Sequence, residues 1–172
     1  TFTVSTTGNA GYCDEVSFTG TIIISPDDEI SLSSAATTTN QTICMGNDPS
    51  ISQITTITYQ LAGGATNASA AGLPAGIQTN YDPLTRVFSI FGTSAETVTN
   101  TTTFNYTVTT SGTCINASEN GSIIIEPSAT LSLTTASSTL NQTVCDNTAI
   151  NNIEFDLVGS AVGAQVSGLP AG

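Results

Sequence analysis

The chain repeats its own sequence at an interval of about one hundred residues, and this repeat restricts the fold more than any single motif. Residues 72–76 (Gly-Leu-Pro-Ala-Gly) recur as residues 168–172, 96 positions later. The run of three isoleucines at 22–24 recurs at 123–125, 101 positions later. Self-similarity at a fixed period is the signature of a tandem array, in which each repeat folds as one unit beside its neighbours.

The two offsets define the boundaries of the repeats. Asn-Gln-Thr-Ile-Cys at 40–44 matches Asn-Gln-Thr-Val-Cys at 141–145 with an offset of 101, whereas Tyr59 matches Phe155 with an offset of 96. The difference predicts a short deletion in the loop after the cysteine, where changes of length are tolerated.

Three segments follow from this register. Residues 1–25 are predicted to be the C-terminal strands of one repeat. Residues 26–127 are predicted to form a complete repeat, and residues 128–172 the N-terminal part of the next one.

The local patterns are those of β-strands. Phe104, Tyr106 and Val108 alternate with polar residues, and the β-branched and aromatic run at 87–91 ends at Gly92. Turn residues separate such runs, and no stretch shows helical periodicity. We therefore predict an all-β chain of Greek-key β-sandwich repeats of about 100 residues, without a helix. The Gly-Leu-Pro-Ala-Gly stretch is expected to bend the chain between two strands, because proline fixes φ and the flanking glycines permit unusual turn conformations.

A series of motifs carries a resemblance to a known class of repeats. Gly-Leu-Pro-Ala-Gly is followed by Ile-Phe-Gly-Thr at 90–93 and by Phe-Asn-Tyr-Thr-Val-Thr at 104–109. This series resembles the Ig-like (PKD-like) repeats of large bacterial surface proteins. The added Asn-Gln-Thr-x-Cys and Thr-x-Ser-Gly-x-Cys elements resemble repeats of very long Bacteroidetes adhesins, which include the gliding-motility adhesins exported by the type IX secretion system. The resemblance implies Ig-like sandwiches at the bacterial cell surface and supplies no catalytic residues. Ser94 departs from it, since the family often has proline after Gly-Thr.

The composition disfavours several classes of function. The chain has one basic residue, Arg86, against thirteen acidic residues, with no histidine and a net charge of −12. Nucleic-acid binding needs a basic surface, and an anionic membrane would repel this chain. The longest aliphatic runs are far shorter than the roughly 20 residues of a membrane-spanning helix. Without histidine or lysine, the chain offers neither a Ser-His-Asp triad nor a Schiff-base lysine, and no Gly-x-Ser-x-Gly elbow is present. We therefore expect no enzyme activity, no cofactor, no nucleic-acid partner and no membrane insertion.

Four cysteines, Cys13, Cys44, Cys114 and Cys145, recur at matched positions, which suits disulfides in an oxidising compartment. Cys13–Cys44 and Cys114–Cys145 are both 31 residues apart, but these pairs would have to span neighbouring repeats. A disulfide requires Cα atoms within about 7 Å. Pairing Cys44 with Cys114 keeps both in one repeat, and closing that long loop would stabilise it by roughly 4 kcal/mol. We therefore predict a Cys44–Cys114 disulfide, with Cys13 and Cys145 paired outside residues 1–172. The alternative is four reduced, buried thiols.

Acidic residues gather where the complete repeat begins. Asp27, Asp28 and Glu29 could supply oxygen ligands for calcium between two repeats, with Asp14 or Glu15 nearby. The equivalent positions of the next repeat, 128–130, are Ser-Ala-Thr and carry no carboxylate. A solvated acidic linker is therefore favoured, and no metal site is predicted.

These observations favour a structural role. We expect a stalk or filament segment of a repetitive, secreted adhesin that attaches the cell to surfaces and could serve gliding motility. Its expected partners are the neighbouring repeats of the same chain, with surface glycans or identical chains in a filament as further partners. One alternative is a glycan- or protein-binding module whose loops, such as 62–71 and 94–103, hold the ligand. Another is an accessory domain of a secreted enzyme.

Overall fold

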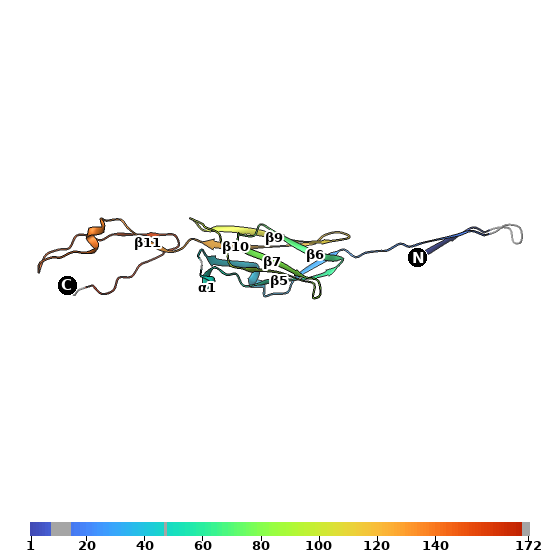
Figure 1. The fold of residues 1–172 in the computed structure, drawn as a ribbon, viewed down its shortest axis with the longest axis horizontal. Coiled ribbons are helices and arrows are strands. Elements are labelled where there is room, and N and C mark those ends of the chain that lie inside the picture. Colours follow the sequence, from blue (N-terminus) through green and yellow to red (C-terminus); the bar gives the residue numbers. More distant parts are fainter. Residues whose placement is uncertain (8–14, 47, 170–172) are drawn as a thin grey trace.

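The computed structural model describes residues 1–7, 15–46 and 48–169. Two four-stranded sheets form a sandwich in the middle of the chain, and a shorter segment extends from each end of it (Figure 1). The strands are β1 (Phe2–Ser5), β2 (Ser17–Gly20), β3 (Asp28–Leu32), β4 (Asn40–Cys44), β5 (Ile57–Gly63), β6 (Ala65–Ala71), β7 (Ile77–Asp82), β8 (Val87–Gly92), β9 (Thr102–Gly112), β10 (Ser118–Glu126), β11 (Thr130–Leu133) and β12 (Phe155–Val158). The prediction of a mainly β chain is confirmed.

The two sheets of the sandwich differ in one strand direction. One sheet has the order β3-β5-β8-β7, and all neighbouring strands in it are antiparallel. The other has the order β4-β10-β9-β6, in which β4 runs parallel to β10 and the remaining pairs are antiparallel. All eight strands lie between Asp28 and Glu126, inside the segment predicted as a complete repeat.

The core lies between the two sheets and follows from the alternation of side chains. Ile57, Tyr59 and Leu61 on β5 point inward, as do Tyr106 and Val108 on β9. Consecutive side chains of a strand point to opposite faces, so every second residue is buried. Each such side chain stabilises the fold by roughly 1.5–3 kcal/mol relative to an exposed position. The other large buried aliphatic and aromatic residues are Ile43, Ile54, Phe88, Ile90, Ile123 and Ile125.

The Gly-Leu-Pro-Ala-Gly stretch carries the chain from one sheet to the other, between β6 and β7. Gly72 and Gly76 have φ angles of +84° and +85°, a region that favours glycine. Pro74 is buried, and its carbonyl accepts a hydrogen bond from the Ile77 N–H at 3.3 Å. A Cβ atom at Gly72 would collide with the carbonyl oxygen of Asn105. The expected bend is therefore present, and both its glycines have a steric reason.

The prediction of a chain without helices is wrong for three short elements. The helix α1 (Pro49–Ser52) forms a single turn, and the turns η1 (Ala36–Thr39) and η2 (Ser137–Leu140) are 3₁₀ helices. The Asp48 carboxylate caps α1 by accepting a hydrogen bond from the Ser50 N–H at 2.9 Å, which also lowers the pKa of Asp48. A capping aspartate followed by proline favours a helix start. One turn is too short to produce a periodic apolar pattern, so it could not be predicted from periodicity.

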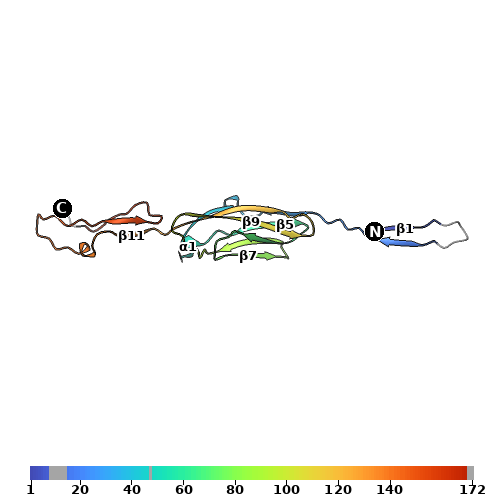
Figure 2. The same cartoon turned by 90° about the horizontal axis from the view of Figure 1, so that it is seen from above.

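The N-terminal segment is a two-stranded hairpin with the register of a hairpin inside the sandwich. In β1–β2, Phe2 lies opposite Gly20, just as Tyr106 lies opposite Gly121 in β9–β10. Gly20 and Gly121 are 101 positions apart, the offset of the sequence repeat. Figure 2 shows this hairpin beyond one end of the sandwich.

The C-terminal segment repeats the beginning of the sandwich. In β11–β12, Leu131 lies opposite Leu157, as Ile30 lies opposite Leu61 in β3–β5. The turn after the first strand is also repeated. The Gln41 side chain donates to two backbone carbonyls at 2.7 and 2.9 Å, and Gln142 makes the equivalent bonds at 2.8 and 2.9 Å. The sequence register is thus also a register of strand pairs and hydrogen bonds.

Candidate functional site at the repeat junctions

The chain enters the sandwich at one end and leaves it at the opposite end. Asp28, the first residue of β3, lies opposite Gly63 at the end of β5. Glu126, the last residue of β10, lies beside Cys44, the last residue of β4. We call the end around Asp28 and Gly63 the N-terminal pole, and the end around Cys44 and Glu126 the C-terminal pole. Figures 1 and 2 show the two outer segments beyond opposite ends of the sandwich.

Asp28 ties the incoming chain to the N-terminal pole. Its side chain is 6 % exposed, and Oδ2 accepts a hydrogen bond from the buried Thr110 hydroxyl at 2.8 Å. Its backbone N–H donates to the Ile115 carbonyl at 3.0 Å. Oδ1 faces Gly112, where a Cβ atom would collide with it. Among the described residues, this Oδ1 is a buried side-chain oxygen without a hydrogen-bond partner. The Asp28 carboxylate therefore has one hydrogen-bond donor, the Thr110 hydroxyl.

The three carboxylates considered for calcium do not converge. Asp27 Oδ1 accepts a hydrogen bond from the Ile115 N–H at 3.4 Å, Asp28 points into the sandwich, and Glu29 is exposed. Asp28 and Glu29 are consecutive on β3, so their side chains leave opposite faces of the sheet. In the part of the chain that the structure describes, no three side chains of His, Cys, Asp or Glu gather into a metal-binding group. Asp14 lies outside the described residues, and among the described ones the calcium alternative finds no ligand set.

The predicted Cys44–Cys114 disulfide is absent, and the pairing within one repeat needs correction. Both residues are free thiols, as is Cys145. Cys44 ends β4 beside Glu126 at the C-terminal pole, whereas Cys114 precedes β10 at the N-terminal pole. The nine residues of β10 separate the two poles by roughly 26 Å at 3.3 Å per residue, far beyond the reach of a disulfide. Cys13 lies outside the described residues.

Cys114 contacts the chain that leads into the repeat. Its Sγ donates to the carbonyl oxygen of Ser25 at 3.4 Å, and its side chain is exposed. Cys44 is half-buried at the opposite pole, where the N–H of the next residue, Met45, donates to the Glu126 carbonyl at 2.8 Å. Each cysteine thus lies beside one of the two linkers of the repeat.

A buried pair of tyrosines joins the two sheets. The hydroxyl groups of Tyr59 on β5 and Tyr106 on β9 are 3.4 Å apart, and Tyr106 donates to the Thr39 carbonyl at 3.3 Å. Burial disfavours the phenolate and raises the pKa of both side chains, and for Tyr106 its hydrogen bond with Tyr59 adds to the effect. Both groups therefore act as neutral, structural hydrogen-bond partners in the core.

The single cation also has a structural position. Arg86 Nη2 donates to the carbonyl oxygens of Gly63 and Ala65, at 3.1 and 2.8 Å. These carbonyls lie in the tight connection between β5 and β6. Residues 62–71, proposed as a loop from the sequence, instead form the end of β5 and the whole of β6, whereas 94–101 is irregular. The glycines here mark a tight turn that carries the chain from one sheet to the other.

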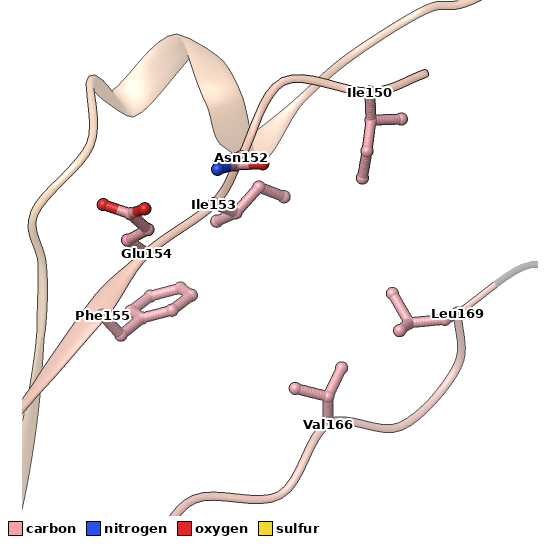
Figure 3. A pocket seen from close by; sticks show the side chains of 7 residues that line it. All are labelled: Ile150, Asn152, Ile153, Glu154, Phe155, Val166 and Leu169. Carbon is pink, nitrogen blue, oxygen red and sulfur yellow. The ribbon is translucent and has the colours of Figure 1, made fainter. Parts of the chain in front are cut away.

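An apolar cavity lies in the C-terminal segment. It has a volume of about 490 Å³ and is lined by Ile150, Asn152, Ile153, Glu154, Phe155, Val166 and Leu169 (Figure 3). At the repeat offset of 96, Ile153 and Phe155 correspond to Ile57 and Tyr59, which are buried in the complete sandwich. The cavity is therefore the inner face of a partial sandwich, with the character of a core and not of a ligand site.

Comparisons with known proteins give no assignment. No family model, no curated protein and no solved structure matches this chain. Across residues 1–7, 15–46 and 48–169, no helix has the length and apolar character needed to cross a membrane.

The sequence did not indicate the roles of Thr110 and Gly112, since nothing in their surroundings marks them as partners of a carboxylate more than 80 residues away in the chain.

Proposed function

We propose that the chain is a stalk segment of a repetitive, secreted adhesin on a bacterial cell surface. The observation that carries the proposal is the path of the backbone through the sandwich, from the N-terminal pole to the opposite, C-terminal pole. Repeats built this way extend the chain along one direction, because the chain leaves each unit at the end opposite to the one where it enters. The role is spatial and mechanical, and it requires no catalytic group.

We further propose that each unit is an Ig-like Greek-key sandwich. With β3, β5, β6, β7, β8, β9 and β10 taken as strands A to G, the sheets have the orders A-B-E-D and G-F-C. This is the strand arrangement of the immunoglobulin constant-type fold. The additional strand β4 lies beside G and continues A into the second sheet. The order supports the resemblance to Ig-like repeats of large Bacteroidetes surface proteins, including those used in gliding.

The proposed partners follow from the same geometry. Neighbouring repeats of the same chain meet at the poles, and surface glycans or identical chains are the outer partners of the filament. A net charge of −12 keeps such filaments apart and soluble unless a specific contact joins them.

Negative-stain electron microscopy of the full-length secreted protein tests the proposal. The expected particle is a long, thin filament with a regular spacing of one sandwich along its axis. A compact particle with the repeats folded back on each other would contradict it.

Immunogold labelling of intact cells tests the location. Antibodies against residues 26–127 should label the outside of the cells, and labelling only after permeabilisation would contradict the proposed location.

A further inference from the structure

Each repeat carries one cysteine at each pole. Cys44 lies at the C-terminal pole of the complete sandwich and Cys114 at its N-terminal pole. Cys145 corresponds to Cys44 in the following repeat, and Cys13 to Cys114 in the preceding one, both at an offset of 101. A junction between two repeats therefore brings together a C-terminal-pole cysteine and an N-terminal-pole cysteine.

The two ends of the sandwich show the two halves of one junction. At its N-terminal pole, Cys114 Sγ is 3.4 Å from the carbonyl oxygen of Ser25, the last residue before Pro26. At its C-terminal pole, Glu126 is the last residue before Pro127, and 101 positions separate Ser25 from Glu126. Glu126 lies beside Cys44 in the β4–β10 pair. Ser25 and Glu126 are thus equivalent positions, one contacted by the cysteine of the following repeat and the other by the cysteine of its own repeat.

The two contacts involve carbonyl oxygens at equivalent positions of two repeats. The Glu126 oxygen accepts the Met45 N–H at 2.8 Å, which places the Cα atom of Cys44 at most roughly 6 Å from that oxygen. The equivalent Ser25 oxygen accepts the thiol of Cys114 at 3.4 Å. When Ser25 is superposed on the equivalent Glu126, the Cys114 position of the following repeat and Cys44 both lie near one carbonyl oxygen. Disulfide-bonded residues have Cα atoms about 4.4–6.8 Å apart, so two cysteines placed around one carbonyl position are close enough to be joined by a local rearrangement of the junction.

We propose that a disulfide links each repeat to the next, from the Cys44 position of one repeat to the Cys114 position of the following repeat. The inference rests on the tandem array of the proposed function, and the partners of Cys44 and Cys114 then lie in repeats beyond residues 1–172. The two thiols lose two protons and two electrons, and a disulfide-carrying oxidoreductase accepts them by thiol–disulfide exchange, its own disulfide being reduced to two thiols. The exposed Cys114 and half-buried Cys44 are accessible to such an oxidant.

The linkage changes how the array carries tension. Only 31 residues separate Cys114 from Cys145, and they include β10, β11 and the following turn. Each such segment runs from a cysteine at the N-terminal pole of one repeat to a cysteine at the C-terminal pole of the next. With every junction crosslinked, disulfides join these segments into a continuous covalent path in which 31 residues span two repeats. These residues are already largely extended, so the path has little slack. Without the disulfides, an unfolding repeat would release about 101 residues, or roughly 350 Å of chain. The crosslinks would therefore prevent unfolding by pulling.

Peptide mapping of the full-length secreted protein under non-reducing conditions tests the pairing. The expected product joins the peptide of Cys44 to the Cys114-equivalent peptide of the next repeat, and reduction separates the two. A bond between Cys44 and Cys114 of the same repeat, or free thiols at both positions in the secreted protein, would overturn the proposal. A filament with free thiols refutes only the crosslink, whereas a compact particle refutes the stalk itself.

A pair of serine variants in the same protein fixes the direction of the linkage. Cys44→Ser should release one thiol for alkylation in the following repeat, and Cys114→Ser should release one in the preceding repeat. If Cys44→Ser instead releases Cys114, the bond lies within the repeat and the proposal fails. Force spectroscopy of the native array adds a mechanical readout. Length steps of roughly 350 Å should appear only after addition of a reductant, and equal steps without reductant would contradict the continuous path.

Discussion

Replacement of Thr110 by valine should destabilise the sandwich far more than the loss of one ordinary hydrogen bond. The Thr110 hydroxyl is the partner of Asp28 Oδ2, and Asp28 Oδ1 already lacks one. Valine has nearly the same shape, so no cavity forms, but the buried carboxylate is left without a donor. An unsatisfied buried group costs about 1–3 kcal/mol, and a charged one costs more. The Ala117 N–H also loses its acceptor at 2.8 Å. We expect a loss of about 3 kcal/mol in the free energy of unfolding.

Denaturant unfolding of the 172-residue chain, followed by circular dichroism, measures this loss. The control is Thr103→Val, an exposed position on the same strand, where the change should stay within about 0.5 kcal/mol. Thr110→Ser keeps the hydroxyl and should retain most of the stability. A Thr110→Val variant as stable as the Thr103→Val control would show that Asp28 does not depend on this hydroxyl.

A double variant separates the buried carboxylate from a general effect at Thr110. Asp28→Ala combined with Thr110→Val removes both partners, and removal of both is less costly than leaving one of them unsatisfied. The double variant should therefore be more stable than the Thr110→Val single variant by at least about 1 kcal/mol. Strictly additive losses would refute the reasoning, because they would mean that the two side chains do not act on each other.

Three further substitutions test the bend, the core and a turn. Gly72→Ala meets both a positive φ and a collision with a backbone carbonyl, so it should cost well over about 1 kcal/mol in unfolding experiments, whereas Gly163→Ala, with open space around it, should cost far less. Ile90→Ala removes a fully buried side chain and should lower the free energy of unfolding by about 2–5 kcal/mol, and a loss below about 1 kcal/mol would contradict its place in the core. The Thr85 hydroxyl and a backbone N–H lower the pKa of Asp82, so Thr85→Val should raise that pKa toward its ordinary value in an NMR titration. Because the folded-state pKa is lowered, this carboxylate stabilises the fold above the ordinary aspartate pKa of 3.8, and the contribution is lost as the pH falls through the lowered value. An unchanged Asp82 titration in the Thr85 variant would contradict this cause.

The parts of the fold that depend on local pattern could be predicted from the sequence. The alternation in Phe104, Tyr106 and Val108 predicted a strand with one buried face, and Tyr106 and Val108 are buried on β9. The glycines and the proline of the repeated motif predicted a bend, because each has a conformational preference of its own. Such features need no knowledge of distant residues, which is why one sequence suffices for them.

The parts that depend on distant partners could not be predicted in this way. Asp28 follows another aspartate and precedes a glutamate, a pattern typical of a solvated linker, and yet it is buried. Its burial depends on Thr110 and Gly112, more than eighty residues away, which supply a hydroxyl and the space left by a missing Cβ atom. No local pattern distinguishes this threonine from the many others in the chain.

The prediction of a Cys44–Cys114 pair is wrong for a related reason, which lies in the direction of one strand. A Cys44–Cys114 pair agreed with the repeat boundaries read from the sequence, since both residues belong to residues 26–127. The decisive fact is that β4 runs parallel to β10, and this places Cys44 at the far end of the strand that Cys114 precedes. Had β4 been antiparallel to β10, the two thiols would lie at the same pole and a disulfide within the repeat would be feasible. One strand direction therefore decides whether the cysteines reinforce a single sandwich or join each sandwich to its neighbour.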